Sequence, residues 1–225
     1  MNKFLIVLSL AFLGLTGCSR LDIAFNWADT YIASKVDDYF DISSKQSKDL
    51  KHDIQKDLQG IKSEVLPQWI ARLKGIQEEV TAGTLHDERI AFYFSLFMKD
   101  VEQFSSRFSG TAVDFISTTN SQQLDYFAKA FHKKNQEDLE KAQNIAKLKK
   151  DYRDKYFEWI EMFVGSLNTD QKKMVEDNIA LSPFPAELKA KNKEYIFEKF
   201  MAMKGSPEEM KNFVKDYYSS PEKYD

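Results

Sequence analysis

The sequence predicts an all-α protein, an elongated bundle of long antiparallel amphipathic helices followed by shorter C-terminal helices. Three observations support this fold class. Helix-breaking residues are scarce, with 8 glycines and 5 prolines among 225 residues. Apolar residues recur in steps of three and four along most of the chain, which places them on one face of a helix. No segment alternates apolar and polar residues over the length that a strand requires.

The first two predicted helices cover about residues 21–39 and 43–82. The apolar stripe of the first helix consists of Leu21, Phe25, Ala28, Ile32, Val36 and Tyr39. The stripe of the second consists of Leu50, Ile54, Leu58, Ile61, Val65, Trp69, Leu73, Ile76 and Val80. Pro67 lies inside this stripe without shifting its register. We therefore expect one helix that is kinked near Pro67, because proline removes a backbone donor, and that ends at Gly83.

The remaining predicted helices follow the same pattern. Thr84, with Asp87 three residues later, can open a third helix. Its stripe is Ile90, Phe94, Phe97, Val101, Phe104, Phe108 and Ala112. A fourth helix is expected over about residues 121–164. Three shorter helices are expected at 169–181, 186–203 and 207–218, separated by the sequences SPFP and GSP.

The N-terminus has the form of an export signal. Lys3 is followed by an uncharged apolar run from Phe4 to Leu15, which is shorter than the about 20 apolar residues that span a bilayer. Cys18, the single cysteine of the chain, follows directly after Leu15-Thr16-Gly17. This tetrapeptide resembles the lipobox of bacterial lipoprotein precursors. The resemblance implies that residues 1–17 are a signal peptide and that Cys18 is the lipid-attachment residue at the mature N-terminus.

The lipobox resemblance also implies a location. Two or more acyl chains hold a protein stably on a membrane, whereas one chain does not. Ser19 at the position after the cysteine resembles the outer-membrane sorting choice, so we expect attachment to the periplasmic face of the bacterial outer membrane. A lipidated Cys18 leaves no thiol for a disulfide, so residues 18–225 are expected to form a single helical periplasmic domain that depends on apolar packing.

The charged residues and the histidines give no catalytic prediction. Without residues 1–17 the net charge is −4, which argues against nucleic acid, whose binders present a basic surface. His52, His86 and His132 lie far apart in the sequence without metal-type spacing, and each is expected to be a solvated surface residue. Asp49, Asp53 and Asp57 step by four between lysines, as in a solvated, salt-bridged helix face. We expect no catalytic residues, no metal and no cofactor.

One locally basic segment has two possible interpretations. Residues 147–155, KLKKDYRDK, carry a tyrosine between the basic residues. The segment could contact lipid headgroups or acidic partners, or it could be a solvated helix face, which is the commoner explanation for such a charge run.

A similar short pattern occurs at three expected helix starts. Each copy has an apolar residue, a small capping residue, two polar residues and an amide: Ile42-Ser43-Ser44-Lys45-Gln46, Ile116-Ser117-Thr118-Thr119-Asn120 and Leu167-Asn168-Thr169-Asp170-Gln171. Ser43, Ser117 and Asn168 are favoured N-cap residues, and Gln46 and Gln171 stand where a capping box needs Glu or Gln. The alternative is a family signature.

The repeated pattern is similar to the Leu-Thr-x-x-Gln signature of the small helical periplasmic chaperones typified by Spy and CpxP, which bind unfolded clients. Over most of its length the chain more closely resembles a family of uncharacterised bacterial helical lipoproteins. The shared features are the lipobox, an early tryptophan-containing helix that leads to DDYFDISSKQ, the sequence LPQW at 66–69 and the later LNTDQ helix start. This family implies a fold and a location, and no catalytic residues.

These observations give three hypotheses. The first is a non-enzymatic, lipid-anchored envelope lipoprotein whose helical domain is a protein-interaction module for an envelope partner. The second is a Spy/CpxP-like periplasmic chaperone or envelope-stress factor. The third, which rests on location alone, is an enzyme that acts on cell-wall material. The sequence does not predict the oligomeric state.

Overall fold

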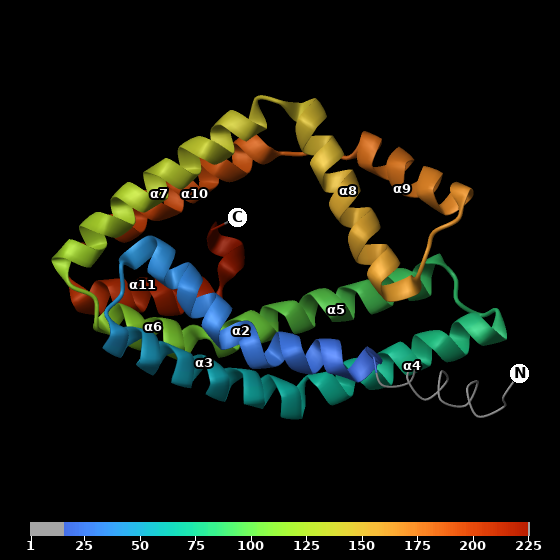
Figure 1. Ribbon diagram of the computed structural model, residues 1–225, viewed down its shortest axis with the longest axis horizontal. Helices are drawn as coiled ribbons and strands as arrows, with labels where there is room; N and C mark the ends of the chain where they lie inside the picture. Colours follow the sequence, from blue (N-terminus) through green and yellow to red (C-terminus); the bar gives the residue numbers. More distant parts are fainter. Residues whose placement is uncertain (1–15, 225) are drawn as a thin grey trace, which may run out of the picture. The chain divides into compact units, whose positions relative to one another are not determined.

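The computed structural model describes the backbone of residues 16–224 and the side chains of residues 25–161 and 165–224 (Figure 1). Over these residues it contains ten α-helices, one short 3-10 helix and no strand. The all-α prediction is therefore confirmed. The helices are α2 (Thr16–Phe40), α3 (Ser44–Glu64), α4 (Leu66–Ala82), α5 (Asp87–Arg107), α6 (Ser109–Ser117), α7 (Ser121–Ala142), α8 (Ile145–Val164), α9 (Thr169–Leu181), α10 (Ala186–Met201) and α11 (Pro207–Ser219), before η1 (Pro221–Tyr224).

The kinked second helix is confirmed, since α3 and α4 are separated only by Val65. The backbone of Val65 is itself α-helical, with φ −93° and ψ −46°. Its amide donates to Ile61 O at 2.9 Å, and its carbonyl accepts from Trp69 N at 3.1 Å. Pro67 lies in the first turn of α4, where a missing backbone donor costs least. Gly83 ends α4 in the left-handed conformation, with φ 67°.

The third and fourth predicted helices are each divided in the structure, which corrects both predictions. The third divides at Phe108 into α5 and α6, and Thr84 does not cap it, because its hydroxyl donates to Glu79 O. The fourth ends at Ala142, and α8 starts anew with Asn144 as its N-cap. The Asn144 side chain accepts from Lys147 N at 3.0 Å. Asn144 follows the long polar stretch of the predicted fourth helix. Its side chain bonds the backbone of the next turn, and this bond starts a new helix instead of continuing the first.

The contacts divide the chain into two compact units. Unit 1 comprises residues up to Tyr126 together with Lys204–Lys223, and unit 2 comprises Phe127–Met203 with the last two residues. The prediction of one domain over residues 18–225 is not decided by this division and stays a prediction.

The core of unit 1 lies between α2, α3, α5 and α6. Its buried members are Ala33 from α2, the α3 residues Leu50, Ile54, Leu58 and Ile61, and Val65. Phenylalanines at positions 25, 104, 108 and 115 pack against them. In Figure 1, α2 lies along α3, and α11 lies beside α6. The first half of the predicted stripe of residues 43–82 is therefore the centre of this unit.

The core of unit 2 joins α7 to α10 through aromatic rings. Phe131 and Phe197 stack with centroids 4.1 Å apart, and Phe127 contacts both Phe197 and Phe200. The buried Asn135 of α7 donates to Glu194 Oε2 of α10 at 2.6 Å. The other pair of helices in this unit is the hairpin of α8 and α9.

Candidate functional site

The predicted lipid-attachment residue lies at the edge of the described chain. The backbone of Cys18 is in the first turn of α2, and its side chain lies outside the described residues, as do residues 1–15 of the predicted signal peptide. None of the helices within residues 16–224 is both long enough and apolar enough to cross a membrane.

The histidines and aspartates singled out in the sequence are only partly where we expected them. His52 and His86 are exposed, and His86 lies 3.9 Å from Glu88. His132 is exposed as well, and its Nδ1 lies 3.2 Å from Glu194 while its ring packs edge-on against Phe197. Among the described residues, no three metal-ligating side chains come together.

The predicted solvated aspartate face is wrong for Asp57. Asp49 pairs with Lys45 at 3.0 Å, as a salt-bridged face would. Asp57 instead accepts a 2.6 Å hydrogen bond from Thr111 of α6, and burial raises the pKa of its carboxyl. This contact contributes to the packing of α3 on α6.

Two of the three repeated patterns are capping boxes. Ser43 accepts from Gln46 N, while the Gln46 side chain accepts from Ser43 N at 3.0 Å. Asn168 and Gln171 make the same pair of bonds at the start of α9.

The predicted cap at Ser117 is wrong, because this residue ends α6 and its hydroxyl donates to Asp114 O. Asn120 caps α7 instead and exchanges two hydrogen bonds with Gln123, at 2.9 and 3.2 Å.

The capping boxes of α3 and α7 bind each other. Gln46 Nε2 donates to Gln123 Oε1 at 3.1 Å, and Gln123 Nε2 donates to Gln46 Oε1 at 2.8 Å. The same two amides also donate to Thr118 O and Asp41 O. Gln123 is 7% exposed. In unit 1 the repeated motif is therefore a structural junction that joins two helix starts 77 residues apart.

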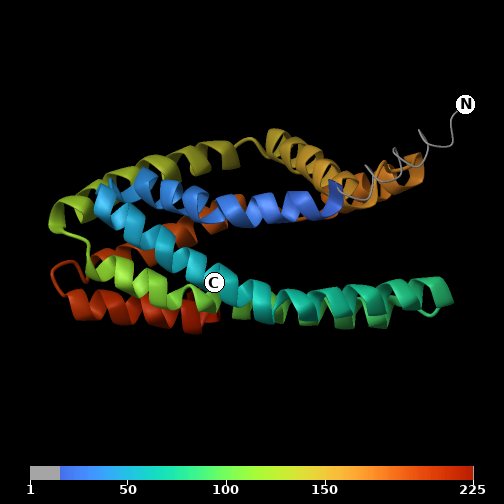
Figure 2. The same cartoon turned by 60° about the horizontal axis from the view of Figure 1, so that its bottom comes forward.

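The second feature of unit 1 is a hairpin of α4 and α5, held together by charged groups. The two helices are joined at the tip by the loop of residues 83–86 (Figure 2), and Tyr93 of α5 donates a hydrogen bond to Glu79 of α4 at 2.8 Å. Arg72 of α4 pairs with Asp100 of α5, which is 5% exposed. Glu64 at the end of α3 pairs with Arg107. At the tip, Arg89 pairs with Glu79. We call these three pairs the ion-pair ladder.

The tip of the hairpin has a further hydrogen bond. Tyr93 OH donates to Glu79 Oε1 at 2.8 Å and accepts from Arg89 Nη2 at 3.0 Å. The Arg89 guanidinium and the Tyr93 hydroxyl hold the pKa of Glu79 below its usual 4.5. A carboxyl with a lowered pKa stabilises the folded state above its ordinary pKa, and this contribution is lost as pH falls through the lowered value.

The apolar side chains of the same hairpin face solvent. The α5 residues Ile90, Phe94, Phe97 and Val101 form the stripe predicted from the sequence, yet they are 53%, 63%, 47% and 38% exposed. The other large exposed apolar residues of the hairpin are Ile70, Leu73, Val80, Phe92 and Met98. Phe92 lies under the Arg89 guanidinium, on the other side of the ladder from the stripe, and Ile70 lies on the outer side of α4. We call the remaining seven residues the hairpin surface. Single exposed apolar residues are common, but large apolar patches on monomers mark interaction sites.

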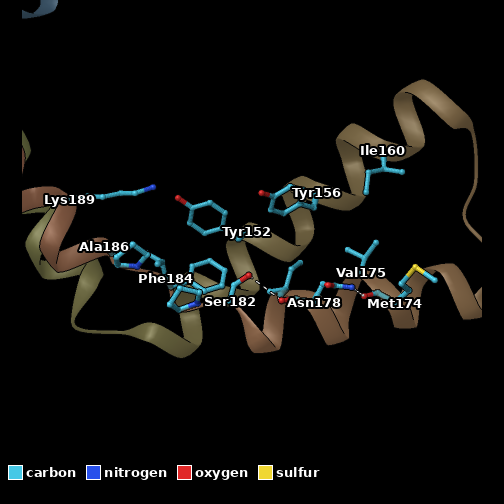
Figure 3. A pocket seen from close by; sticks show the side chains of 14 residues that line it. Tyr152, Tyr156, Ile160, Met174, Val175, Asn178, Ser182, Phe184, Ala186 and Lys189 are labelled. Atoms are coloured by element: carbon cyan, nitrogen blue, oxygen red, sulfur yellow. Dashed lines mark hydrogen bonds between the residues drawn. The ribbon is translucent and has the colours of Figure 1, made fainter. Parts of the chain in front are cut away.

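A groove in unit 2 is the second candidate site (Figure 3). It has a volume of about 560 Å³. One wall is a face of α8, with Leu148, Tyr152, Tyr156 and Ile160. The other wall is α9, and the SPFP loop with the start of α10 closes one end. The sequence singles out residues 147–155 and the SPFP loop separately, and it does not predict that they meet. The signal was the four-residue step of Leu148, Tyr152 and Tyr156.

The capping boxes give a test of the junction. Gln171→Ala should lower the free energy of unfolding by about 0.5–1 kcal/mol, since only a cap is lost. Gln46→Ala should cost about 2–3 kcal/mol, because it also removes both of the hydrogen bonds that Gln46 makes with the buried Gln123 side chain. Denaturant unfolding followed by circular dichroism measures both. Equal costs for the two variants would show that the junction contributes nothing beyond capping.

The ion-pair ladder gives a second test. Arg72→Met should destabilise the protein by about 2–4 kcal/mol, because Asp100 is left buried without a partner. Adding Asp100→Leu should restore most of the loss, since no buried charge then remains. Lys74→Met, an exposed residue of the same helix, is the matched control. The ladder would carry no structural role if the Arg72 and Lys74 variants unfolded alike in guanidinium chloride.

Comparison with known proteins identifies the family of the chain. A family model described as a family of unknown function (DUF6279) matches residues 38–224. No curated protein and no solved structure matches the chain. The match begins near the end of α2 and covers all of the later helices, including the ion-pair ladder and the groove. The chain therefore belongs to the DUF6279 family, a family of unknown function.

Proposed function

We propose that the protein is a non-enzymatic envelope lipoprotein, anchored through Cys18 to the periplasmic face of the outer membrane, whose helical region binds a protein partner. The anchor is supported by the N-terminal sequence, where a basic start, a short apolar run and Leu15-Thr16-Gly17-Cys18 occur together. The binding role is supported by the hairpin surface.

The hairpin surface carries the proposal because its exposure follows from specific side-chain pairing. The face of α5 that meets α4 contains Arg89, Tyr93 and Asp100, which are bound to Glu79 and Arg72. The ladder thus occupies the side of α5 where an ordinary helical hairpin would bury apolar side chains. The apolar stripe lies beside it: Phe97 packs on Trp69 of α4, with ring centroids 5.2 Å apart, and the other members of the stripe stay accessible.

The composition of the surface fits a protein partner. Protein interfaces are enriched in aromatic residues and methionine at their centre and are surrounded by polar residues. The hairpin surface has Phe94, Phe97 and Met98 in α5. The charged residues of the ion-pair ladder lie beside them. A partner with an apolar stripe of its own could bury this surface as a third helix.

A chaperone function is the second candidate, favoured by the same exposed apolar residues, which could bind unfolded segments of many clients. The repeated helix-start motif gives it less support, because Gln46 is used in the junction with Gln123. The distinguishing assay is suppression of client aggregation at substoichiometric amounts. A specific partner predicts no suppression, and a chaperone predicts suppression that is lost in a hairpin-surface variant and retained in Gln171→Ala.

The binding surface can be tested by photo-crosslinking in living cells. A benzophenone amino acid at Phe94 should give adducts of defined mass, whereas the same group at Lys99, an exposed position on the opposite face of α5, should give none. Leu73→Ser should remove the adducts from Phe94 while leaving the melting temperature nearly unchanged, because Leu73 is 64% exposed. Equal adducts from both positions, or none from Phe94, would contradict a binding role for this surface.

The anchor has an independent test. Cys18→Ser should abolish incorporation of labelled fatty acid and leave the precursor uncut, because serine offers no thiol for the diacylglyceryl group. Cys18 is the only cysteine of the chain, so no other thiol can replace it. Label that persists on the Cys18→Ser protein would rule out this attachment site.

A further inference from the structure

The groove of unit 2 has ends of different character. At one end, Lys189 of α10 reaches along the groove beside Tyr152, and Lys149 lies 5.5 Å from the ring of Phe184 (Figure 3). At the other end the walls are Ile160 and Met174. No acidic residue lines the groove among the described residues. The groove is therefore apolar along its length and cationic at one end.

The polar groups of the groove divide into those already bonded and those open to a ligand. Asn178 donates to Met174 O at 2.8 Å and Ser182 donates to Asn178 O at 3.1 Å, so the backbone of α9 already accepts from these side chains. Within the described residues, the hydroxyls of Tyr152 and Tyr156 and the Lys189 ammonium have no hydrogen-bond partner. Both hydroxyls point toward the Lys189 end in Figure 3.

The closed end is held in a strained conformation. Phe184, between Pro183 and Pro185, has φ 45°, which is unfavourable for a bulky side chain. Its ring packs edge-on against Tyr152 at 4.9 Å and lies under the Lys149 ammonium. Such strain persists only where neighbouring groups enforce it, and it is common at ligand-binding sites. Here it places an aromatic wall next to the cationic end.

We propose that this groove binds the acyl chain of a free fatty acid, with the carboxylate at Lys189 and the tyrosine hydroxyls and the methyl end near Met174. The wall from Leu148 to Ile160 spans 12 residues of helix, or about 18 Å at 1.5 Å per residue. With carbon–carbon bonds of about 1.5 Å, an extended chain of about 14 carbons has this length. The volume also lies within the usual range for small-ligand pockets. This site is separate from the hairpin surface and does not depend on a protein partner.

The groove predicts the chain length and the head-group charge of its ligand. Each methylene buried against the groove should tighten binding by about fourfold, until the chain fills the wall at about 14 carbons. The head group must be anionic, because a cationic head would face the Lys189 ammonium, which has no acidic neighbour in the groove. Myristate should therefore bind at least tenfold more tightly than tetradecyltrimethylammonium, which has the same chain length and the opposite charge.

The test is photolabelling of the full chain in isolated cell envelopes, where added fatty acid cannot enter lipid synthesis. A diazirine-bearing hexadecanoate should label peptides from residues 148–160 and 174–189, and myristate should compete at concentrations at least tenfold below those of tetradecyltrimethylammonium. Lys189→Met should reduce this labelling at least fivefold. The matched control Lys155→Met, an exposed α8 residue outside the groove, should leave it unchanged.

A second variant tests the apolar end without disturbing the core. Met174 is 65% exposed, so Met174→Trp should fold normally while shortening the groove. Competition by myristate should weaken at least fivefold, and competition by decanoate should change less than twofold. The proposal is overturned if label falls outside the two peptides, if both lysine variants label alike, or if the cationic competitor equals myristate.

Discussion

The arrangement of unit 1 depends on one buried charge. Asp100 is 5% exposed, and a carboxylate at that depth is stable only with a partner, which Arg72 supplies from α4. The charges of the ion-pair ladder alternate in sign along the hairpin. A slip of about two helical turns would place Arg72 opposite an arginine and Asp100 opposite a glutamate. The ladder therefore specifies a register, which contact between two apolar faces would leave less well defined.

This register also determines what the hairpin presents to solvent. Because α5 contacts α4 chiefly through Tyr93 and Asp100, the apolar stripe lies to the side, and apart from the contact of Phe97 with Trp69 it remains accessible. An exposed stripe lowers the net gain from folding, and the core around Ile54 and Ile61 must compensate for it. No disulfide can contribute if Cys18 carries lipid. A partner that covers the stripe removes this apolar surface from water. The free energy of burial that the folded chain lacks is then gained when the complex forms.

Local signals explain most of what the sequence predicted. The boxes at Ser43 and Asn168 and the end at Gly83 depend on residues within one turn, so they could be read directly. The break at Asn144 was missed because several residues of that polar run could cap a helix. Which apolar residues are buried was harder to predict from the sequence. A stripe shows which residues share a helix face, but it does not show which face meets another helix. The partner of Asp100 lies 28 residues away, and the walls of the groove come from two helices and a loop.

Oxidative footprinting by hydroxyl radicals tests the central claim most directly, that the hairpin surface is exposed by the fold and covered by a partner. The purified full chain should be oxidised quickly at Phe94 and Met98, while Ile54 and Ile61 should stay protected. In intact cell envelopes, oxidation of Phe94 and Met98 should fall several-fold, and oxidation of Trp159, an exposed residue of unit 2 outside the groove, should not. Slow oxidation of Phe94 in the purified chain would contradict the fold of the hairpin, and equal oxidation in both samples would contradict a bound partner.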